Sequence, residues 1–175
     1  MNSTPHEIPI WDGIVRLFHW SIVVLFFLNF FILEDGERWH EWAGYVVGAL
    51  LLLRFVWGFI GSHNARFCHF FPTYERICHH LTAVRARQFD PTEGHNPIGA
   101  LMIFLLLLLL SLTVISGWML TLDTFWGVEW VEETHEMAAN LTLLAVIVHV
   151  SAVVIMGKVL GISLIRPMIT GKRRL

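Results

Sequence analysis

The sequence predicts an all-α protein, a transmembrane four-helix bundle. Two observations lead to this fold class. The 175 residues are 55% hydrophobic and only 15% charged, which is too apolar for a soluble domain of this size. In addition, four stretches are each as long as the roughly 20 apolar residues that cross a bilayer. We expect one integral membrane domain over residues 1–175. Its predicted spans lie near 14–33, 37–61, 97–122 and 133–160, and its one sizeable loop covers 62–96.

Local signals mark the ends of the predicted spans. The Glu-Asp-Gly turn at 34–36 ends the first span, and Gly58 and Gly61 close the second. Pro97 is favourable in the first turn of the third helix. The acids that begin at Glu133 suit the positive N-terminus of the fourth helix. We therefore expect each span to be one helix.

The 62–96 loop contains one further predicted helix. Its apolar residues recur at helical spacing beside several arginines: Tyr74, Ile77, Leu81 and Val84. This pattern predicts a basic amphipathic helix lying on the inner membrane surface. Cys68 and Cys78 are too few for a disulfide scaffold, and the histidines beside them match no zinc spacing, so their role stays open.

The basic residues predict the orientation in the membrane. Ten of the twelve Lys and Arg residues lie in the N-terminal, 62–96 or C-terminal segments, and Arg54 lies within the second span. Only Arg38 lies in the two short loops on the other side. Because Lys and Arg mark cytoplasmic segments, we expect both termini and the 62–96 loop to be cytoplasmic. The chain is then expected to be a multi-pass membrane protein.

The opposite side is predicted to be strongly acidic. It carries nine acids: Glu34, Asp35, Glu37, Glu41, Asp123, Glu129, Glu132, Glu133 and Glu136. Acids contribute little to topology, so they need another explanation. One is that they only keep exposed loops soluble. We favour a docking surface for a basic partner, because complementary potentials steer encounter.

Four histidines are the candidate site residues. An ionisable side chain at membrane depth costs free energy, so its presence there indicates a function. They are His19, His40, His135 and His149. At about 1.5 Å per residue, His19 lies roughly 7 Å inside the cytoplasmic start of its helix, and His149 about 24 Å from the outer start of its own. His40 and His135 each fall in the first turn of a helix that starts outside. By depth they form an inner pair, His19 with His149, and an outer pair, His40 with His135.

Two nitrogens at each depth favour haem over other metal centres. A zinc site normally recruits three or four ligands at one level, whereas a porphyrin supplies four of the six ligands of its iron. Axial histidines from facing helices are typical of haem sites in bundles. No Cys-x-x-Cys-His sequence is present, so the haems are predicted to be b-type. Two such haems would lie about 20 Å apart, iron to iron.

Five more residues are candidates for contact with a cofactor. Gly44 and Gly48 follow His40 on its own helix face and leave room for a porphyrin, although small residues at this spacing also serve plain helix packing. Arg16 and Arg54 can hold haem propionates or, alternatively, extend to the interface. His95 can relay protons for quinone at the inner end of the third span, or be a solvated helix-start residue.

These residues lie in segments that resemble one known family. They are WDGIVRLFHW at 11–20, WHEWAG at 39–44, GHNP at 94–97, and His135-Glu136 followed by His149. Together they resemble the bacterial cytochrome b561 family, which includes the b-type cytochrome subunits of nickel-iron hydrogenases. The resemblance covers essentially the whole chain. It implies a four-helix di-haem electron carrier of the bacterial inner membrane that exchanges electrons with quinones, with His19, His40, His135 and His149 as the iron ligands.

The resulting hypothesis is an electron-transfer cytochrome b that links the quinone pool to a periplasmic redox protein, such as a c-type cytochrome. Whether it is itself a quinol-oxidising enzyme stays open. One alternative is a superoxide oxidase that passes electrons to quinone, for which Arg38 is the one outer cation. Another is a hydrogenase subunit, although those tend to be longer. A haem-free proton or metal-ion transporter is a third.

The expected partners follow from this hypothesis. They are membrane lipid, quinone and a periplasmic protein on the acidic face, and we expect no nucleic acid. A homodimer is compatible with the sequence.

Overall fold

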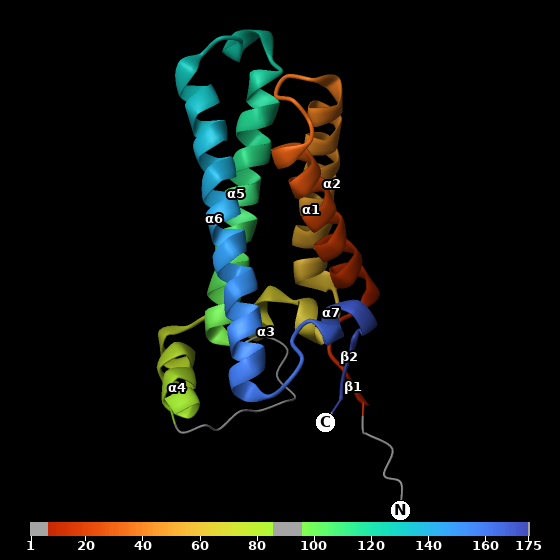
Figure 1. The fold of residues 1–175 in the computed structure, drawn as a ribbon, viewed down its shortest axis with the longest axis vertical. Coiled ribbons are helices and arrows are strands. Elements are labelled where there is room, and N and C mark those ends of the chain that lie inside the picture. Colours follow the sequence, from red (N-terminus) through yellow and green to blue (C-terminus); the bar gives the residue numbers. More distant parts are fainter. Residues whose placement is uncertain (1–6, 86–95, 175) are drawn as a thin grey trace, which may run out of the picture. The chain divides into compact units, whose positions relative to one another are not determined.

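The computed structural model describes residues 7–85 and 96–174, and it is dominated by four long helices (Figure 1). They are α1 (Gly13–Phe31), α2 (Arg38–Ile60), α5 (Pro97–Leu120) and α6 (Glu129–Leu160). All four are long and apolar enough to cross a membrane. Such helices suit a bilayer because each satisfies its own backbone hydrogen bonds. The predicted all-helical architecture with four candidate spans is therefore confirmed.

Seven short elements connect or flank these helices. They are β1 (Glu7–Pro9), η1 (His63–Ala65), α3 (Phe67–Phe70), α4 (Tyr74–Arg85), η2 (Asp123–Phe125), α7 (Arg166–Thr170) and β2 (Lys172–Arg174). The helix expected within the 62–96 loop is present as α4.

One helix boundary differs clearly from the prediction. Helix α6 begins at Glu129 rather than at residue 133. The amide of Val131 bonds the Val128 carbonyl at 3.0 Å, so the chain is already turning before the predicted start. His135 consequently lies in the second turn of α6 and not the first, whereas His40 lies in the first turn of α2.

The chain divides into two compact units. The first, here called the bundle unit, comprises Phe18–Phe55 and Ile103–Val148, and so contains parts of all four long helices. Its buried apolar side chains come from each of them: Ile22, Phe26, Val47, Leu51, Leu107, Leu109, Leu110, Val131, Ala138 and Ala145. A polar contact joins α2 to the residue that follows α5, since the Tyr45 hydroxyl donates to Thr121 Oγ1 over 3.2 Å.

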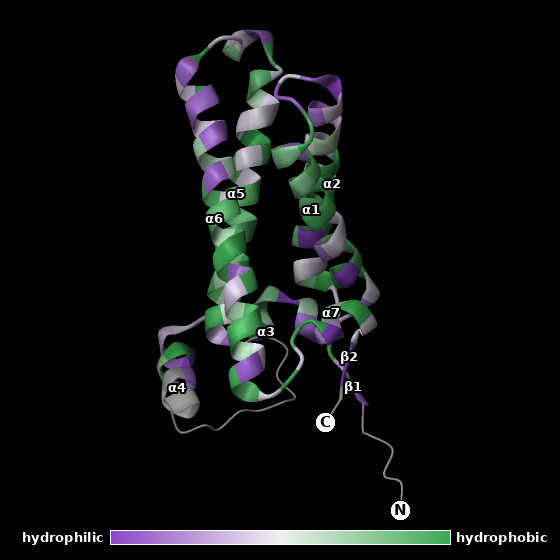
Figure 2. Ribbon diagram, viewed as in Figure 1, coloured by the Kyte–Doolittle hydropathy of each residue, from purple (hydrophilic) through white to green (hydrophobic). Residues whose placement is uncertain are grey.

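Exposed tryptophans occur at the helix ends of the bundle unit. They are Trp39, Trp42, Trp118, Trp126 and Trp130. Figure 2 shows that hydrophobic residues dominate the middle of these helices, whereas hydrophilic residues gather near the α1–α2 and α5–α6 connections. Tryptophan is enriched where a protein crosses the membrane–water interface. This end of the bundle unit therefore has the composition of an interface.

The second unit, here called the terminal unit, comprises Met1–Leu17, Val56–Met102 and His149–Leu175. In it β1 pairs antiparallel with β2, and Ile8 lies opposite Arg173. A small core forms from Ile10, Trp11, Val15 and Ala65, with Trp57 and Met168 packed against it. The two ends of the described chain are thus joined within this unit.

Gly171 is the residue that makes this junction sterically feasible. Its carbonyl accepts the amides of Ile10 and Trp11 at 2.8 and 3.1 Å. Its φ of 81° is in the left-handed region, and a Cβ there would lie 2.9 Å from the Trp11 carbonyl oxygen. Only glycine allows this approach.

Candidate functional site

His40 and His135 face one another in the bundle unit. Helix α2 supplies His40 close to its N-terminus, and α6 supplies His135. Their ring centres are 6.2 Å apart, with the ring planes at 68°. A metal ion bound by two imidazoles through bonds of about 2 Å separates the ring centres by roughly 6 Å. The outer pair predicted from the sequence therefore lies close together, at a separation that leaves room for one metal ion between the rings.

The ring of His135 is oriented by helix α5. Its Nδ1 lies 2.9 Å from the carbonyl oxygen of Thr113, which can only accept. Nδ1 must therefore carry the proton and donate, so Nε2 keeps the lone pair that binds a metal. Ser116 Oγ lies 3.3 Å from the same Nδ1 but also donates to the Leu112 carbonyl at 2.7 Å.

Gly117 allows α5 to approach this ring. A Cβ at this position would lie 2.8 Å from His135 Cε1 and 3.1 Å from Nδ1. A side chain there would push the imidazole away from the Thr113 carbonyl. The sequence analysis did not identify Thr113, Ser116 or Gly117 as site residues. Their one visible signal is that small and polar residues interrupt an otherwise leucine-rich span.

His40 carries a polar atom that the described residues do not satisfy. Its Nδ1 is buried without a hydrogen-bond partner, and Asp35 Oδ1 is the nearest carboxylate at 3.7 Å. That distance is too long for a hydrogen bond. A buried polar atom without a partner is costly, so the His40 ring is poised to use its nitrogens for a ligand. The donor set and its spacing fit an iron held between two imidazoles.

The inner histidines lie in different units, so the structure describes each one separately. His19 is half-buried on α1 of the bundle unit, with the Trp20 ring edge-on at 5.1 Å. His149 is half-buried on α6 of the terminal unit. Their pairing remains a prediction.

The two glycines proposed to make room for a porphyrin differ in their surroundings. A Cβ on Gly44 would meet nothing within 4 Å, whereas one on Gly48 would lie 3.1 Å from Val114 Cγ1. The position of Gly44 is therefore open, and Gly48 serves the close packing of α2 against α5.

The predicted arginines also have distinct environments. Arg54 is only 4% exposed in the bundle unit. Arg16, in the terminal unit, donates through Nη2 to the backbone carbonyl of Ile169. It therefore ties α1 to the C-terminal segment, a role that the sequence analysis missed. His95 lies outside the described residues.

The start of α1 in the terminal unit is organised by Asp12. Its Oδ1 accepts the Val15 amide at 2.8 Å, and its Oδ2 accepts Trp57 Nε1–H at 3.0 Å and the Ser62 hydroxyl. Burial opposes ionisation, but these hydrogen bonds outweigh it, so the pKa of the Asp12 carboxyl lies below its ordinary value of 3.8.

Four long apolar helices place the chain in the class of helical membrane proteins, and the facing imidazoles of His40 and His135 are a donor pair that suits a metal cofactor. Among the described residues, no group of three or more His, Cys, Asp or Glu side chains could hold a metal ion. The model of one family, prokaryotic cytochrome b561, matches residues 10–171. The chain belongs to this family. No curated protein and no solved structure matches it.

Family membership and the helical architecture together define the general function. The protein is a multi-pass bacterial membrane cytochrome of the b type, which binds haem b and takes part in electron transfer. The suspected family resemblance is thereby confirmed.

Proposed function

We propose that this protein holds two b-type haems, each between two histidines, and moves electrons between membrane quinone and a redox protein in the periplasm. The single observation that carries the proposal is the separation of 6.2 Å between the rings of His40 and His135. Haem iron, when bound, supplies reversible one-electron oxidation and reduction. His19 and His149 are the proposed second ligand pair.

The residues of the chain have separate tasks in this proposal. The Thr113 carbonyl fixes the tautomer of His135, because it accepts from Nδ1 and directs Nε2 to the metal. Gly44 leaves space beside His40 for the porphyrin edge. Buried Arg54 offers a positive charge for a propionate. Arg16 and His95 remain candidates for contact with haem or quinone.

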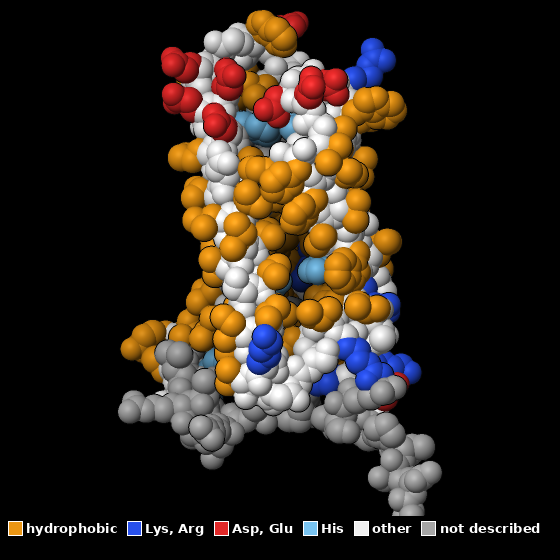
Figure 3. Space-filling view, in the orientation of Figure 1, with side chains coloured by type: hydrophobic (Ala, Val, Ile, Leu, Met, Phe, Trp, Pro, Cys, Tyr) orange, Lys and Arg blue, Asp and Glu red, His pale blue; other side chains and the backbone are white. Residues whose placement is uncertain are grey.

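The proposed docking surface for the periplasmic partner consists of the nine acids at one end of the bundle unit. Figure 3 shows Asp and Glu side chains gathered there, close to histidine side chains. The acids belong to the α1–α2 and α5–α6 connections and the adjoining helix ends, and Arg38 is the one cation among them. A basic redox protein would be steered toward such a surface.

The first test is a reduced-minus-oxidised optical spectrum with the haem-to-protein ratio, measured on the detergent-purified protein. We expect two six-coordinate b haems in the native protein. His135→Ala and His149→Ala should each retain one haem, because each removes a ligand from a different pair. The double variant should retain none.

A matched control is His79→Ala, since His79 is an exposed histidine on α4. It should keep both haems. A colourless native protein, a single haem, or a His135→Ala variant that keeps two unperturbed haems would contradict the proposal.

The docking surface predicts a salt-dependent rate of electron transfer to a basic soluble partner. Exposed charges are screened over about 10 Å at 0.1 M salt, so the rate should fall steadily from about 10 mM to 200 mM. Replacing Glu132, Glu133 and Glu136 with Gln should slow transfer at low salt and flatten this dependence. Glu75→Gln, on α4, is the control. Transfer that is independent of salt would contradict an electrostatic docking face.

A further inference from the structure

A carboxylate lies beside the buried ring nitrogen of His40. Asp35 Oδ1 is 3.7 Å from His40 Nδ1, and that nitrogen has no hydrogen-bond partner among the described residues. The Asp35 side chain is 98% exposed, so no packing opposes its movement. The two atoms need to approach by less than 1 Å to reach hydrogen-bond distance. A small rotation of this side chain therefore completes a hydrogen bond to the ring.

A tight turn sets the position of Asp35. The Glu37 amide donates to the Glu34 carbonyl at 3.2 Å. Gly36 within this turn has φ at 77°, a conformation that glycine adopts without strain. Helix α2 begins immediately after the turn and carries His40 in its first turn. The backbone of Asp35 is thus held a short distance along the chain from the ring that its side chain approaches.

The two facing histidines differ in the acceptor available to Nδ1. His135 Nδ1 donates to the Thr113 carbonyl, which carries no net charge. A metal bound at Nε2 of His40 leaves the proton on Nδ1, and a buried N–H group needs an acceptor. Asp35 supplies a carboxylate there, and it forms no ion pair with a Lys or Arg of the described chain. His40 therefore has a charged acceptor nearby, whereas His135 has a neutral one.

We propose that Asp35 is a positioning residue for His40. Its carboxylate accepts the Nδ1 proton, directs Nε2 toward the metal and lowers the reduction potential of the haem held between His40 and His135. This inference rests on the proposed binding of haem by that pair. Oxidised haem iron carries one more positive charge than reduced iron, so a negative charge bonded to a ligand ring stabilises the oxidised state.

The competing explanation is that Asp35 acts only as one of the nine acids of the docking surface. The field of that surface depends on how many charges it carries, and not on one contact with the His40 ring. Glu34 and Glu37 provide the matched comparison. Both are exposed acids of the same turn, and neither forms an ion pair with a described residue.

The test is a spectroelectrochemical titration of the detergent-purified holoprotein, which gives the midpoint potential of each haem. His149→Ala identifies the haem of the His40–His135 pair, because this variant should retain only that haem. Asp35→Asn removes the charge and keeps an oxygen that can accept. We expect it to raise the midpoint potential of this haem by ~30 mV, which is about a threefold change in a one-electron equilibrium and is typical of an exposed ionic contact. The other haem should be unchanged.

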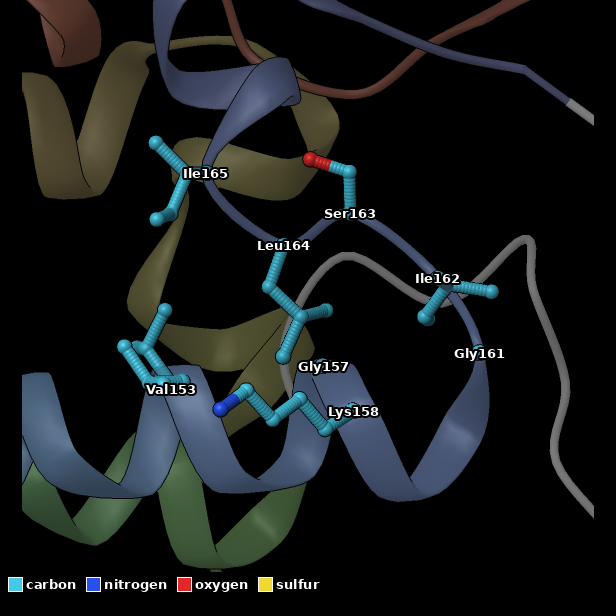
Figure 4. Close-up of a pocket in the computed structure, with 9 residues that line it drawn as sticks. Val153, Gly157, Lys158, Gly161, Ile162, Ser163, Leu164 and Ile165 are labelled. Carbon is cyan, nitrogen blue, oxygen red and sulfur yellow. The ribbon is translucent and has the colours of Figure 1, made fainter.

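The control variants separate the contact from the general charge. Glu34→Gln and Glu37→Gln should each shift this potential by less than half as much. Asp35→Glu keeps a carboxylate within reach and should restore most of the native value. Lys158→Gln also changes the net charge by one. Lys158 lies on the part of α6 in the terminal unit, where Figure 4 shows its side chain along the helix, and its loss should leave this haem unchanged.

Three results would overturn the inference. Equal shifts in the three acid variants would indicate the field of the docking surface. An unchanged potential in Asp35→Asn would show that the carboxylate does not act on the ring, and a shift confined to the other haem would exclude His40 as its target. In all three cases a native protein with two b haems leaves the proposed function standing. A native protein without haem at the His40–His135 pair would overturn both.

Discussion

The two units of this protein use their polar side chains differently. In the bundle unit, the imidazole of His135 on α6 contacts Thr113 and Ser116 of α5, and many of the buried side chains are aliphatic. In the terminal unit, polar side chains bind backbone and loop groups that lie far away in the sequence. Asn64, for example, donates to the Ile10 carbonyl at 3.0 Å, and Arg16 donates to the Ile169 carbonyl.

The difference follows from where the backbone is helical. Within the long helices each amide and carbonyl is already paired, so a polar side chain is free to serve a cofactor. Where the helices end, unpaired backbone groups need partners from side chains. A polar residue in the bundle unit is therefore a candidate for function, whereas one in the terminal unit is first a candidate for holding the chain ends together.

The largest expected effect comes from Gly117→Val in the bundle unit. A branched side chain there must displace the His135 ring, because even a Cβ would lie 2.8 Å from Cε1. We expect the loss of one of two haems, measured by the haem-to-protein ratio. Leu112→Val introduces the same side chain at an exposed position of α5 and should keep both. Full haem content in Gly117→Val would show that the ring contact is not needed for binding.

A smaller effect is expected from Asp12→Ala in the terminal unit. It removes the cap of α1 and the acceptor for Trp57 and Ser62. We expect a loss of about 2 kcal/mol in the free energy of unfolding. The helix cap contributes about 1 kcal/mol, and the hydrogen bonds from Trp57 and Ser62 to a partly exposed carboxylate contribute about as much again. Thermal unfolding in detergent measures it. The haem spectrum of folded Asp12→Ala should be the same as that of the native protein. Ser62→Ala removes only one of these hydrogen bonds and should lose about half as much stability.

Asp12 also makes the stability of the terminal unit depend on pH. Its pKa in the folded protein lies below the ordinary value of 3.8, so the folded state binds this proton less readily than the unfolded state. The stabilisation is complete above the ordinary value and is lost as the pH falls through the folded pKa. The melting temperatures of native protein and Asp12→Ala should therefore converge as the pH is lowered below about 4. A constant difference between pH 6 and pH 3 would contradict this origin.

The sequence alone predicts the features that depend on the length of its apolar runs and on the positions of residues along them. Apolar runs locate all four long helices, and depth along those helices pairs His40 with His135, which the structure places together. The start of α6 was less predictable, since Glu129 to Glu133 are as compatible with a loop as with a helix N-terminus. In the structure this polar segment is helical and carries His135 one turn further from its helix start than expected.

Contacts between distant segments were not predictable. The acceptor for His135 Nδ1 is the backbone oxygen of Thr113, and a backbone atom has no signature in a sequence. Likewise Trp11, Asp12 and Arg16 belong to the segment that resembles the family. The structure shows that Trp11 packs in a small core, Asp12 caps α1 and Arg16 holds the Ile169 carbonyl. Residues of a family motif can thus stabilise the fold through contacts that only the folded chain shows.

The smallest expected effect is that of Glu7→Gln, which weakens the junction of the two chain ends. Glu7 pairs with Arg166 at 3.1 Å and with Lys172 at 3.7 Å, but all three side chains are partly exposed. Such pairs contribute about 0.2–1 kcal/mol each and are screened by salt. We expect a melting temperature slightly below that of native protein at low salt and equal to it near 1 M salt. A loss that persists at high salt would show that Glu7 acts through the β1–β2 pairing rather than through its charge.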